Sequence, residues 1–225
     1  MTEKIQVAID GPASSGKSTV AKLLAKRFNY VYCDTGAMYR SVTLAALRHK
    51  IDLQDNEAVI ALAQSITISF KPGDPDQLVF IDGQDVTRQI REAEVSANVS
   101  TVAAIPAVRA EMTKQQRQIA SRGGIVMDGR DIGTTVLPDA QVKIFLVATA
   151  HERALRRYRE NVQKGIPTAP LEEIEKAIKL RDQKDSTRKV SPLKKAEDAT
   201  EIDTTSLSIA QVTDKIAAII KKARA

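Results

Sequence analysis

The sequence predicts an α/β fold in which parallel strands alternate with helices. A short apolar run near the N-terminus leads into a glycine-rich loop and then into helical spacing. A β-rich run at 30–33, a turn and a second helical stretch repeat this order. The run Val142–Val147 is nearly continuous in apolar residues, which is typical of a parallel strand covered on both faces. With 225 residues, 43% of them hydrophobic, the chain can bury a substantial core.

The first strand and helix are joined by a loop that matches the phosphate-binding pattern G-x-x-x-x-G-K-[ST] from Gly11 to Ser18. Its glycines let successive backbone N–H groups face one anion, and the N-terminus of the following helix adds a favourable dipole. The dipole is weak, so Lys17 must neutralise the β- and γ-phosphates, and the Ser18 hydroxyl is placed to bind Mg2+. The expected ATP-binding residues are Gly11, Pro12, Ala13, Ser14, Ser15, Gly16, Lys17, Ser18 and Thr19.

The remaining elements follow from local patterns. We expect helices at about 18–27, 37–49, 53–64, 92–102, 106–120, 150–162, 171–185 and from 208, and strands at 30–33, 125–127, 142–147 and 199–203. Residues 65–88 alternate in hydropathy around turns at Pro72–Pro75 and Asp82–Gly83, which predicts a small antiparallel meander. We expect Asp55 to cap a helix and Ser208 to form a capping box with Gln211.

Composition narrows the class of protein. The apolar runs are shorter than the ~20 residues that a membrane span needs. The first residues lack the pattern of a secretory signal, so we expect a cytoplasmic protein. The single cysteine, Cys33, permits no internal disulfide and reads as a small buried hydrophobe at a strand end. His49 and His151 have no evident partners for a metal site.

The positive charge is concentrated in one part of the chain. Residues 151–195 contain 13 Lys or Arg against 7 Asp or Glu, an excess that equals the net charge of +6 of the whole chain. The segment is rich in arginine, whose planar fork suits phosphate. Aromatic residues make up only 4% of the chain, which argues against base stacking and a nucleic-acid partner.

Arginines outside the loop indicate a second anionic substrate. Arg40 follows the turn at 34–36, Arg130 lies between two aspartates after a strand, and Arg181 and Arg188 follow the basic helix. Arg109 lies in the first turn of its helix, where a cation opposes the helix dipole. Either a polar or anionic partner offsets this charge, or the side chain turns to solvent.

Four segments together, in order and spacing, resemble the bacterial cytidylate kinase family of nucleoside monophosphate kinases: 11–19, 34–40 (DTGAMYR), 128–134 (DGRDIGT) and 181–188 (RDxxDxxR). The resemblance covers nearly the whole chain. It implies a three-layer α/β/α P-loop kinase core with a central parallel sheet, a small antiparallel β insert in the monophosphate-binding region, and a helical lid. One domain of residues 1–225 would hold a core of about 1–63, 101–150 and 171–225, an insert of about 64–100 and a lid of about 151–170.

The resemblance also implies roles for individual residues. Arg40 and Arg130 would hold the phosphate of CMP, three residues would face cytosine, and Arg181 with Asp185 would face the ribose. The CMP-binding set is Thr35, Arg40, Ser100, Arg109, Arg130, Asp131, Arg181, Asp185 and Arg188, of which Ser100, Arg109 and Asp131 face the base. Thr35 stands where the family often has serine. The catalytic set is Lys17, Asp128, Arg130, Arg153, Arg157 and Arg188, and Arg153, Arg157 and Arg188 would close over the transferring phosphoryl group.

The resulting hypothesis is that ATP and Mg2+ phosphorylate CMP or dCMP to CDP or dCDP in pyrimidine nucleotide metabolism. Asp131 can accept a hydrogen bond from the cytosine amino group but would face an acceptor in UMP, which favours CMP. We expect a monomer without nucleic-acid or membrane partners. Three alternatives remain open: another nucleoside monophosphate kinase, a P-loop NTPase that uses hydrolysis to drive a partner or bind nucleic acid, or a non-enzymatic interaction surface on the basic helix of residues 151–164.

Overall fold

The computed structural model describes residues 4–71, 73, 77–163 and 165–224. The chain divides into two compact units, one formed by residues 1–32 and 120–225 and the other by residues 33–119. Most of the turn expected at Pro72–Pro75 lies outside the described residues, since only Gly73 is described there. None of the helices in the described ranges is long and apolar enough to cross a membrane.

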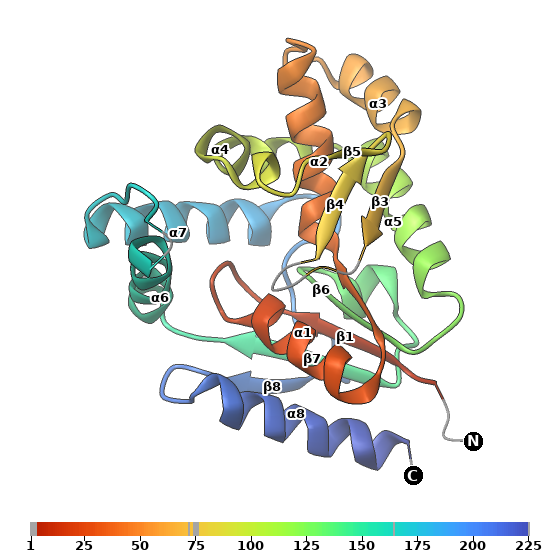
Figure 1. Cartoon of the computed structure of the whole chain (residues 1–225), viewed down its shortest axis with the longest axis vertical. Helices are drawn as coiled ribbons and strands as arrows, with labels where there is room; N and C mark the ends of the chain where they lie inside the picture. Colours follow the sequence, from red (N-terminus) through yellow and green to blue (C-terminus); the bar gives the residue numbers. More distant parts are fainter. Residues whose placement is uncertain (1–3, 72, 74–76, 164, 225) are drawn as a thin grey trace. The chain divides into compact units, whose positions relative to one another are not determined.

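The first unit is built on a five-stranded sheet with the order β2-β6-β1-β7-β8 (Figure 1). The strands are β1 (Gln6–Asp10), β2 (Val31–Asp34), β6 (Ile125–Gly129), β7 (Val142–Val147) and β8 (Thr200–Asp203), and the last two residues of β2 belong to the second unit. β1 pairs in parallel with β6 and β7, and β7 with β8. β6 is buried along its whole length, because both faces of this central strand are covered.

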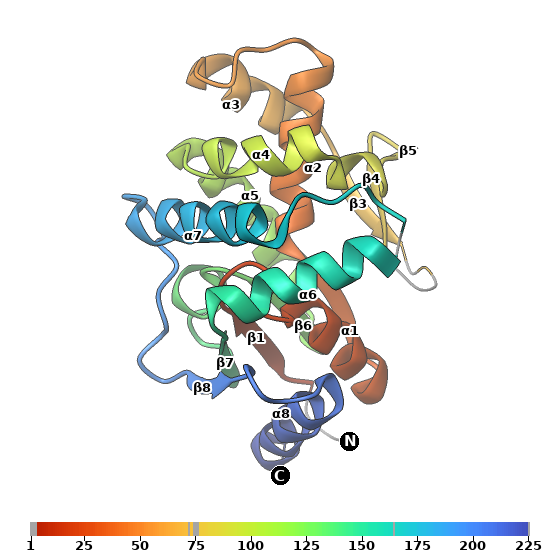
Figure 2. The same cartoon turned by 90° about the vertical axis from the view of Figure 1, so that its left-hand side faces the viewer.

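Four helices complete the first unit: α1 (Lys17–Phe28), α6 (Ala150–Gln163), α7 (Leu171–Thr187) and α8 (Ile209–Ala223). α1 and α8 form one hydrophobic core with the sheet, in which Leu24, Ile144 and Ile216 are fully buried. α8 begins with the predicted capping box, since Ser208 Oγ accepts from the Gln211 amide and the Gln211 side chain accepts from the Ser208 amide. α6 and α7 lie beside each other in Figure 2, and His151 on α6 pairs with Glu175 on α7 at 3.0 Å.

The second unit contains α2 (Thr35–Arg48), α3 (Asn56–Ser65), α4 (Ala93–Val102) and α5 (Pro106–Ala120). A short 3-10 turn, η1 (Gln89–Arg91), precedes α4. The strands β3 (Ile68–Lys71), β4 (Leu78–Ile81) and β5 (Gln84–Asp85) form the predicted small antiparallel sheet. The α/β/α class with a parallel central sheet and an antiparallel insert is therefore confirmed.

Asp55 caps α3 as predicted, by accepting from the Ala58 amide. The expected turn at 34–36 is wrong: Asp34 caps α2 by accepting from the Ala37 amide, so the helix begins at Thr35, two residues before the expected start. α3 begins after Asp55, about one turn later than the expected start at residue 53. Cys33 is fully buried, as predicted for a small hydrophobe at a strand end.

Candidate active site

The loop between β1 and α1 depends on two glycines for different reasons. Gly11 has a φ of +146°, and a Cβ atom there would lie 2.2 Å from the backbone oxygen of Leu146 in β7. Gly16 has a φ of +90° but open space around it, so only its backbone conformation favours glycine. The predicted strand, loop and helix are thus present, and the loop is held close against the neighbouring strand.

Lys17 is a buried cation at the start of α1, with 5% of its surface exposed. Its ammonium group donates to the backbone oxygen of Pro12 at 2.6 Å and to Ser15 Oγ at 3.3 Å, both within the loop. Burial, together with the positive charge of Arg130, lowers the pKa of Lys17 well below its usual value. An anion bound in this loop would stabilise the charged form of Lys17, because it would replace the lost hydration.

Ser18 and Asp128 bring two hard oxygen donors together beside the loop. Ser18 Oγ donates to Asp128 Oδ2 at 2.8 Å, and Asp128, at the C-terminal part of β6, is only 4% exposed. Hydroxyl and carboxylate oxygens suit Mg2+. No group of three or more His, Cys, Asp or Glu residues within the described part of the chain could hold a metal ion by itself. The pair therefore fits an ion that phosphate oxygens and water also hold.

Tyr32 and Asp10 contact the same region and were not predicted as site residues. The Tyr32 hydroxyl donates to Asp128 Oδ1 at 2.8 Å. Asp10, the last residue of β1, accepts from the amides of Ile132 and Gly133 at 2.8 and 2.7 Å. Burial raises the pKa of Asp10 to about 7, although these two amides oppose the shift. Neither residue belongs to the loop pattern, and their partners lie far away in the sequence.

Asp10 supports the segment that carries Arg130 and Asp131. Its two amide donors open the π-helical turn Ile132–Val136 (η2), which directly follows Asp131. Gly133 is closely packed, because a Cβ atom there would meet the Lys143 side chain at 3.2 Å. The loop after β1 and the segment after β6 are thus joined through one carboxylate.

Three arginine–aspartate pairs connect β6, α6 and α7 in the first unit. Arg130 Nε donates to Asp185 Oδ2 at 2.9 Å, and Arg188 donates to Asp131 Oδ1 at 3.3 Å. Arg153 donates to Asp182 Oδ2 at 2.6 Å. The aspartates expected near the base and ribose of CMP are therefore engaged by arginines that were themselves predicted to bind phosphate.

Burial and neighbouring charges shift the pKa values of two residues of α7. Burial, together with the positive charge of Arg130, lowers the pKa of Arg181 to about 10. Burial alone would raise the pKa of Asp185, but the charges of Arg130, Arg181 and Arg188 outweigh it, so this pKa is lowered. The Nε atom of Arg181 is buried without a hydrogen-bond partner. The cluster carries excess positive charge that a phosphate group could neutralise.

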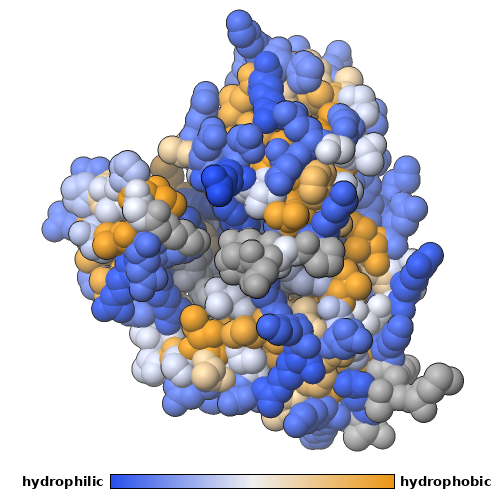
Figure 3. Space-filling model, in the orientation of Figure 1, coloured by the Kyte–Doolittle hydropathy of each residue, from blue (hydrophilic) through white to orange (hydrophobic). Residues whose placement is uncertain are grey.

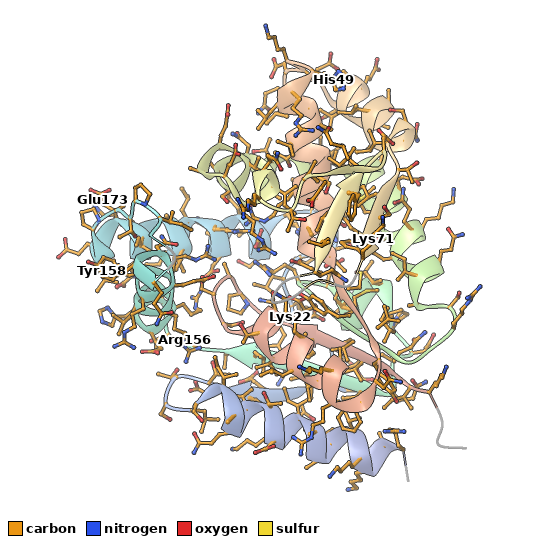
Figure 4. All side chains as sticks on the ribbon, viewed as in Figure 1. Lys22, His49, Lys71, Arg156, Tyr158 and Glu173 are labelled. Atoms are coloured by element: carbon orange, nitrogen blue, oxygen red, sulfur yellow. The ribbon has the colours of Figure 1, made fainter. Side chains whose placement is uncertain are left out.

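The basic helix α6 also contacts the phosphate-binding loop. Arg153 donates to the backbone oxygen of Ala13 at 3.1 Å, and Arg157 donates to Ser14 Oγ at 3.1 Å. Arg156, labelled in Figure 4, donates to both oxygens of Thr204, which follows β8. Hydrophilic residues gather over α6 in Figure 3. Arg156 and Thr204 were not predicted as site residues, and Asp182 was named only within the motif at 181–188 without a role, because spacing alone does not reveal such distant partners.

The second unit holds the other four residues that were expected to bind CMP. Thr35 is buried in the first turn of α2, and Ser100 lies on α4. Arg40 on α2 donates to Ser96 Oγ at 2.7 Å and to the backbone oxygen of Ile90 at 3.1 Å, so it is positioned by α4 and η1.

Arg109 on α5 is buried, with 2% of its surface exposed, so the alternative that it turns to solvent is wrong. It donates to the backbone oxygen of Ala103 at 3.2 Å, and its guanidinium lies 5.2 Å from the centre of the Tyr39 ring. The carbonyl dipole and the aromatic face therefore offset the unfavourable interaction of this cation with the helix dipole.

The structure thus divides the expected residues between the two units. The first unit brings together Lys17, Ser18, Asp128, Arg130, Asp131, Arg153, Arg157, Arg181, Asp185 and Arg188. The second unit contains Thr35, Arg40, Ser100 and Arg109.

Comparisons with known proteins identify the family of the chain. Residues 7–222 match the family model described as cytidylate kinase. A cytidylate kinase from Limosilactobacillus fermentum is 68% identical over 222 residues, covering 99% of this chain and 98% of the relative. A cytidylate kinase from Bacillus cereus is 54% identical over 220 residues, covering 98% of this chain and 97% of the relative. Among solved structures, a gluconokinase from Sinorhizobium meliloti 1021 has a TM-score of 0.51 at 12% identity, covering 100% of this chain and 95% of its own, which supports the fold alone.

Proposed function

The chain belongs to the cytidylate kinase family, and from this premise we propose that it transfers the γ-phosphoryl group of ATP to CMP and dCMP, giving CDP or dCDP and ADP. We further propose that the reaction serves pyrimidine nucleotide metabolism in the cytoplasm and that the enzyme acts as a monomer on these small substrates.

One observation carries the proposal most directly. Arg153 and Arg157 of α6 contact the loop that surrounds Lys17, while Arg130 and Arg181 are close enough to Lys17 and to each other to lower the pKa values of Lys17 and Arg181. Positive groups from the ATP loop, from β6 and from α7 therefore converge. Phosphoryl transfer requires such convergence, because negative charge on the transferring group is spread over several oxygens.

The donor half of the reaction would use the loop Gly11–Thr19. Its backbone amides and Lys17 would bind the β- and γ-phosphates, and Ser18 with Asp128 would hold Mg2+ together with the nucleotide. When bound, Mg2+ neutralises phosphate charge. Lys17 would exchange its present contacts with Pro12 and Ser15 for phosphate oxygens.

The acceptor half would use the arginines and aspartates outside the loop. We propose that Arg40 and Arg130 bind the CMP phosphate and that Arg181 and Asp185 bind the ribose hydroxyls. Arg181 and Asp185 are four residues apart on α7 and therefore share a helix face. Ser100, Arg109 and Asp131 are proposed to read the cytosine, and Thr35 to bind near the sugar.

Recognition of cytosine follows from hydrogen-bond chemistry. Asp131 offers only acceptor atoms, which match the amino group of cytosine and not the carbonyl oxygen of uracil. Sites that bond a substrate group can reject an analogue without it by roughly 10⁴–10⁵. The Arg188 guanidinium, 3.3 Å from Asp131 Oδ1, orients this carboxylate.

Residues 151–170 are proposed to act as a lid. α6 ends at Gln163, and Gly165, with a φ of +64° and open space around it, lies in the proposed lid turn Gly165–Pro167. Closure would bring Arg153 and Arg157 of the lid onto the transferring group, where Arg188 would also act, and would exclude water, which suppresses ATP hydrolysis. An arginine in this role is worth about 10³–10⁵ in rate.

A steady-state assay tests the proposal. Purified protein with Mg-ATP is given CMP, dCMP, UMP, AMP or no acceptor, and ADP formation is followed. We expect CMP and dCMP to be turned over well above UMP and AMP, with little hydrolysis when no acceptor is present. Equal turnover of UMP or AMP would indicate a different monophosphate kinase, and fast acceptor-free hydrolysis would indicate an NTPase.

A further inference from the structure

Asp128 is held at both carboxylate oxygens by hydroxyl groups from different elements. Ser18 Oγ, in the first turn of α1, donates to Oδ2, and the Tyr32 hydroxyl, on β2, donates to Oδ1, each at 2.8 Å. Asp128 is 4% exposed, so its orientation depends on these bonds more than on water. Two fixed oxygens define the plane of the carboxylate.

This orientation matters for the metal that the proposed function requires. Each hydroxyl carries one hydrogen, and Ser18 directs its hydrogen to Asp128, which leaves lone pairs of Ser18 Oγ for a cation. A carboxylate has about four acceptor positions, so Asp128 has capacity beyond these two bonds for water bound to the same cation. Ser18 and Asp128 can therefore bind Mg2+ together only while the Asp128 carboxylate keeps this orientation.

Tyr32 has a packing role that must be separated from the role of its hydroxyl. Its ring is partly buried against the core of the first unit. Lys22 of α1, labelled in Figure 4, places its ammonium group 5.9 Å from the ring centre. Neither contact needs the hydroxyl group. Phenylalanine would therefore keep these two contacts and remove the hydrogen bond to Asp128.

We propose that Tyr32 is a positioning residue for the magnesium site. Its hydroxyl group holds the Asp128 carboxylate in the orientation in which Asp128 and Ser18 together bind Mg2+. The inference rests on the proposed function, because that function supplies the Mg-nucleotide. In this proposal Tyr32 acts through Asp128 and not by binding the metal itself. Residues that orient a metal site in this way typically change metal affinity or activity by about tenfold or more when they are altered.

The test compares Tyr32→Phe with Tyr30→Phe. Tyr30 is a matched control, because it lies two positions earlier and its hydroxyl accepts from the Ile5 amide at 3.4 Å, with no bond to Asp128. Calorimetry measures ATP binding with EDTA and over a series of Mg2+ concentrations. We expect the wild type and both variants to bind metal-free ATP equally. The Mg2+ concentration that gives half of the Mg2+-dependent gain in ATP affinity should rise about tenfold in Tyr32→Phe and stay unchanged in Tyr30→Phe.

A double-mutant comparison separates positioning from folding. If Tyr32 acts through Asp128, Tyr32→Phe combined with Asp128→Asn weakens the Mg2+ dependence no further than Asp128→Asn alone. The thermal midpoint of Tyr32→Phe should match that of Tyr30→Phe. An unchanged Mg2+ requirement in Tyr32→Phe, or an equal loss of metal-free ATP binding, would overturn the inference. A wild-type protein that binds Mg-ATP but does not phosphorylate CMP would overturn the proposed function, while the binding measurements still decide the role of Tyr32.

Discussion

Arg188 and Asp131 lie 57 residues apart in the chain and form an ion pair of 3.3 Å in which both side chains are almost fully buried, 7% and 5% exposed. A buried pair of this kind is costly to break, because the remaining charge loses its partner in a dry environment. The carboxylate that we propose to read cytosine is thus already desolvated and oriented before a nucleotide arrives.

The first prediction concerns base selectivity. Asp131→Asn replaces one acceptor by a donor, which suits the carbonyl oxygen of uracil better than the amino group of cytosine. We expect the ratio of kcat/KM for CMP to that for UMP to fall by at least about a hundredfold. Asp139→Asn, at an exposed position in the turn before β7, is the control and should keep the wild-type ratio. Selectivity that survives Asp131→Asn would exclude this carboxylate as the base reader.

The second prediction concerns the contact between α6 and the phosphate-binding loop. Arg153→Met removes the donors to Ala13 and Asp182 and leaves the Asp182 carboxylate without its arginine. We expect a loss of about 3 kcal/mol in the free energy of unfolding and weaker ATP binding. Urea unfolding and calorimetry measure the two effects. Arg159→Met, on the exposed side of the same helix, should change neither.

The third prediction is a pH dependence of stability that arises from Asp10. Its pKa is about 7 in the folded protein and 3.8 without burial, so the folded state holds a proton that the unfolded state releases between these values. The free energy of unfolding therefore falls as pH rises through this window, by at most about 1.4 kcal/mol per pH unit. Urea unfolding between about pH 5 and pH 7 should show this slope in the wild type and not in Asp10→Asn.

The test for Asp10 is the difference between the wild type and Asp10→Asn in how steeply the free energy of unfolding changes with pH, and not the difference in stability at one pH. The substitution also places an amide group against the N–H donors of Ile132 and Gly133, which lowers stability at every pH. Asp185, whose pKa is lowered, titrates at more acidic pH and does not enter the window. Parallel pH profiles for the two proteins would mean that Asp10 is already ionised at pH 5.

The fourth prediction uses the two loop glycines. Gly11→Ala would place a Cβ atom 2.2 Å from the backbone oxygen of Leu146, which cannot move away without disturbing β7. Gly16→Ala meets only conformational strain, which costs about 1–3 kcal/mol. We expect Gly11→Ala to abolish ATP binding and lower the thermal midpoint more than Gly16→Ala does. Thermal unfolding and nucleotide titration would show the opposite order if the close approach to Leu146 were unimportant.

The fifth prediction separates stability from activity at Lys17. The pKa of this buried lysine is lowered, so folding disfavours its charged form. Lys17→Met keeps the apolar stem and removes the charge, and we expect it to raise the free energy of unfolding by about 1–2 kcal/mol at neutral pH. The same change should abolish phosphoryl transfer. A destabilised Lys17→Met protein would show that the bonds to Pro12 and Ser15 outweigh the cost of burial.

The sequence predicted the elements well where periodicity and capping signals were strong. Helical and strand spacing located the parallel sheet, and Ser208 with Gln211 marked the start of α8. The P-loop pattern identified Lys17 and Ser18 because its spacing reflects a single local geometry. Helix α5 was also placed correctly, from residue 106 to residue 120. Its pattern predicts one apolar face of Val108, Met112 and Ile119, but Ile119 is 37% exposed, so only the first two residues are buried there.

The pairing of charges could not be predicted in the same way. Asp182 and Asp185 share one face of α7, and no local rule shows that one meets Arg153 and the other Arg130. From the sequence, Tyr32 is an ordinary aromatic residue of a strand. Only the structure shows that its hydroxyl donates a hydrogen bond to Asp128, 96 residues away. Such contacts depend on the order of strands in the sheet, which brings distant side chains to one edge.

The arginine–aspartate pairs in the first unit have a consequence for ionic strength. Each guanidinium of Arg130, Arg153 and Arg188 already has an anionic partner within the protein, so an arriving phosphate exchanges with a carboxylate and displaces few small ions. Affinity that arises from counterion release falls steeply with added salt, whereas an exchange between buried partners is screened much less. Nucleotide binding should therefore tolerate changes in cellular salt far better than the basic character of α6 and α7 suggests.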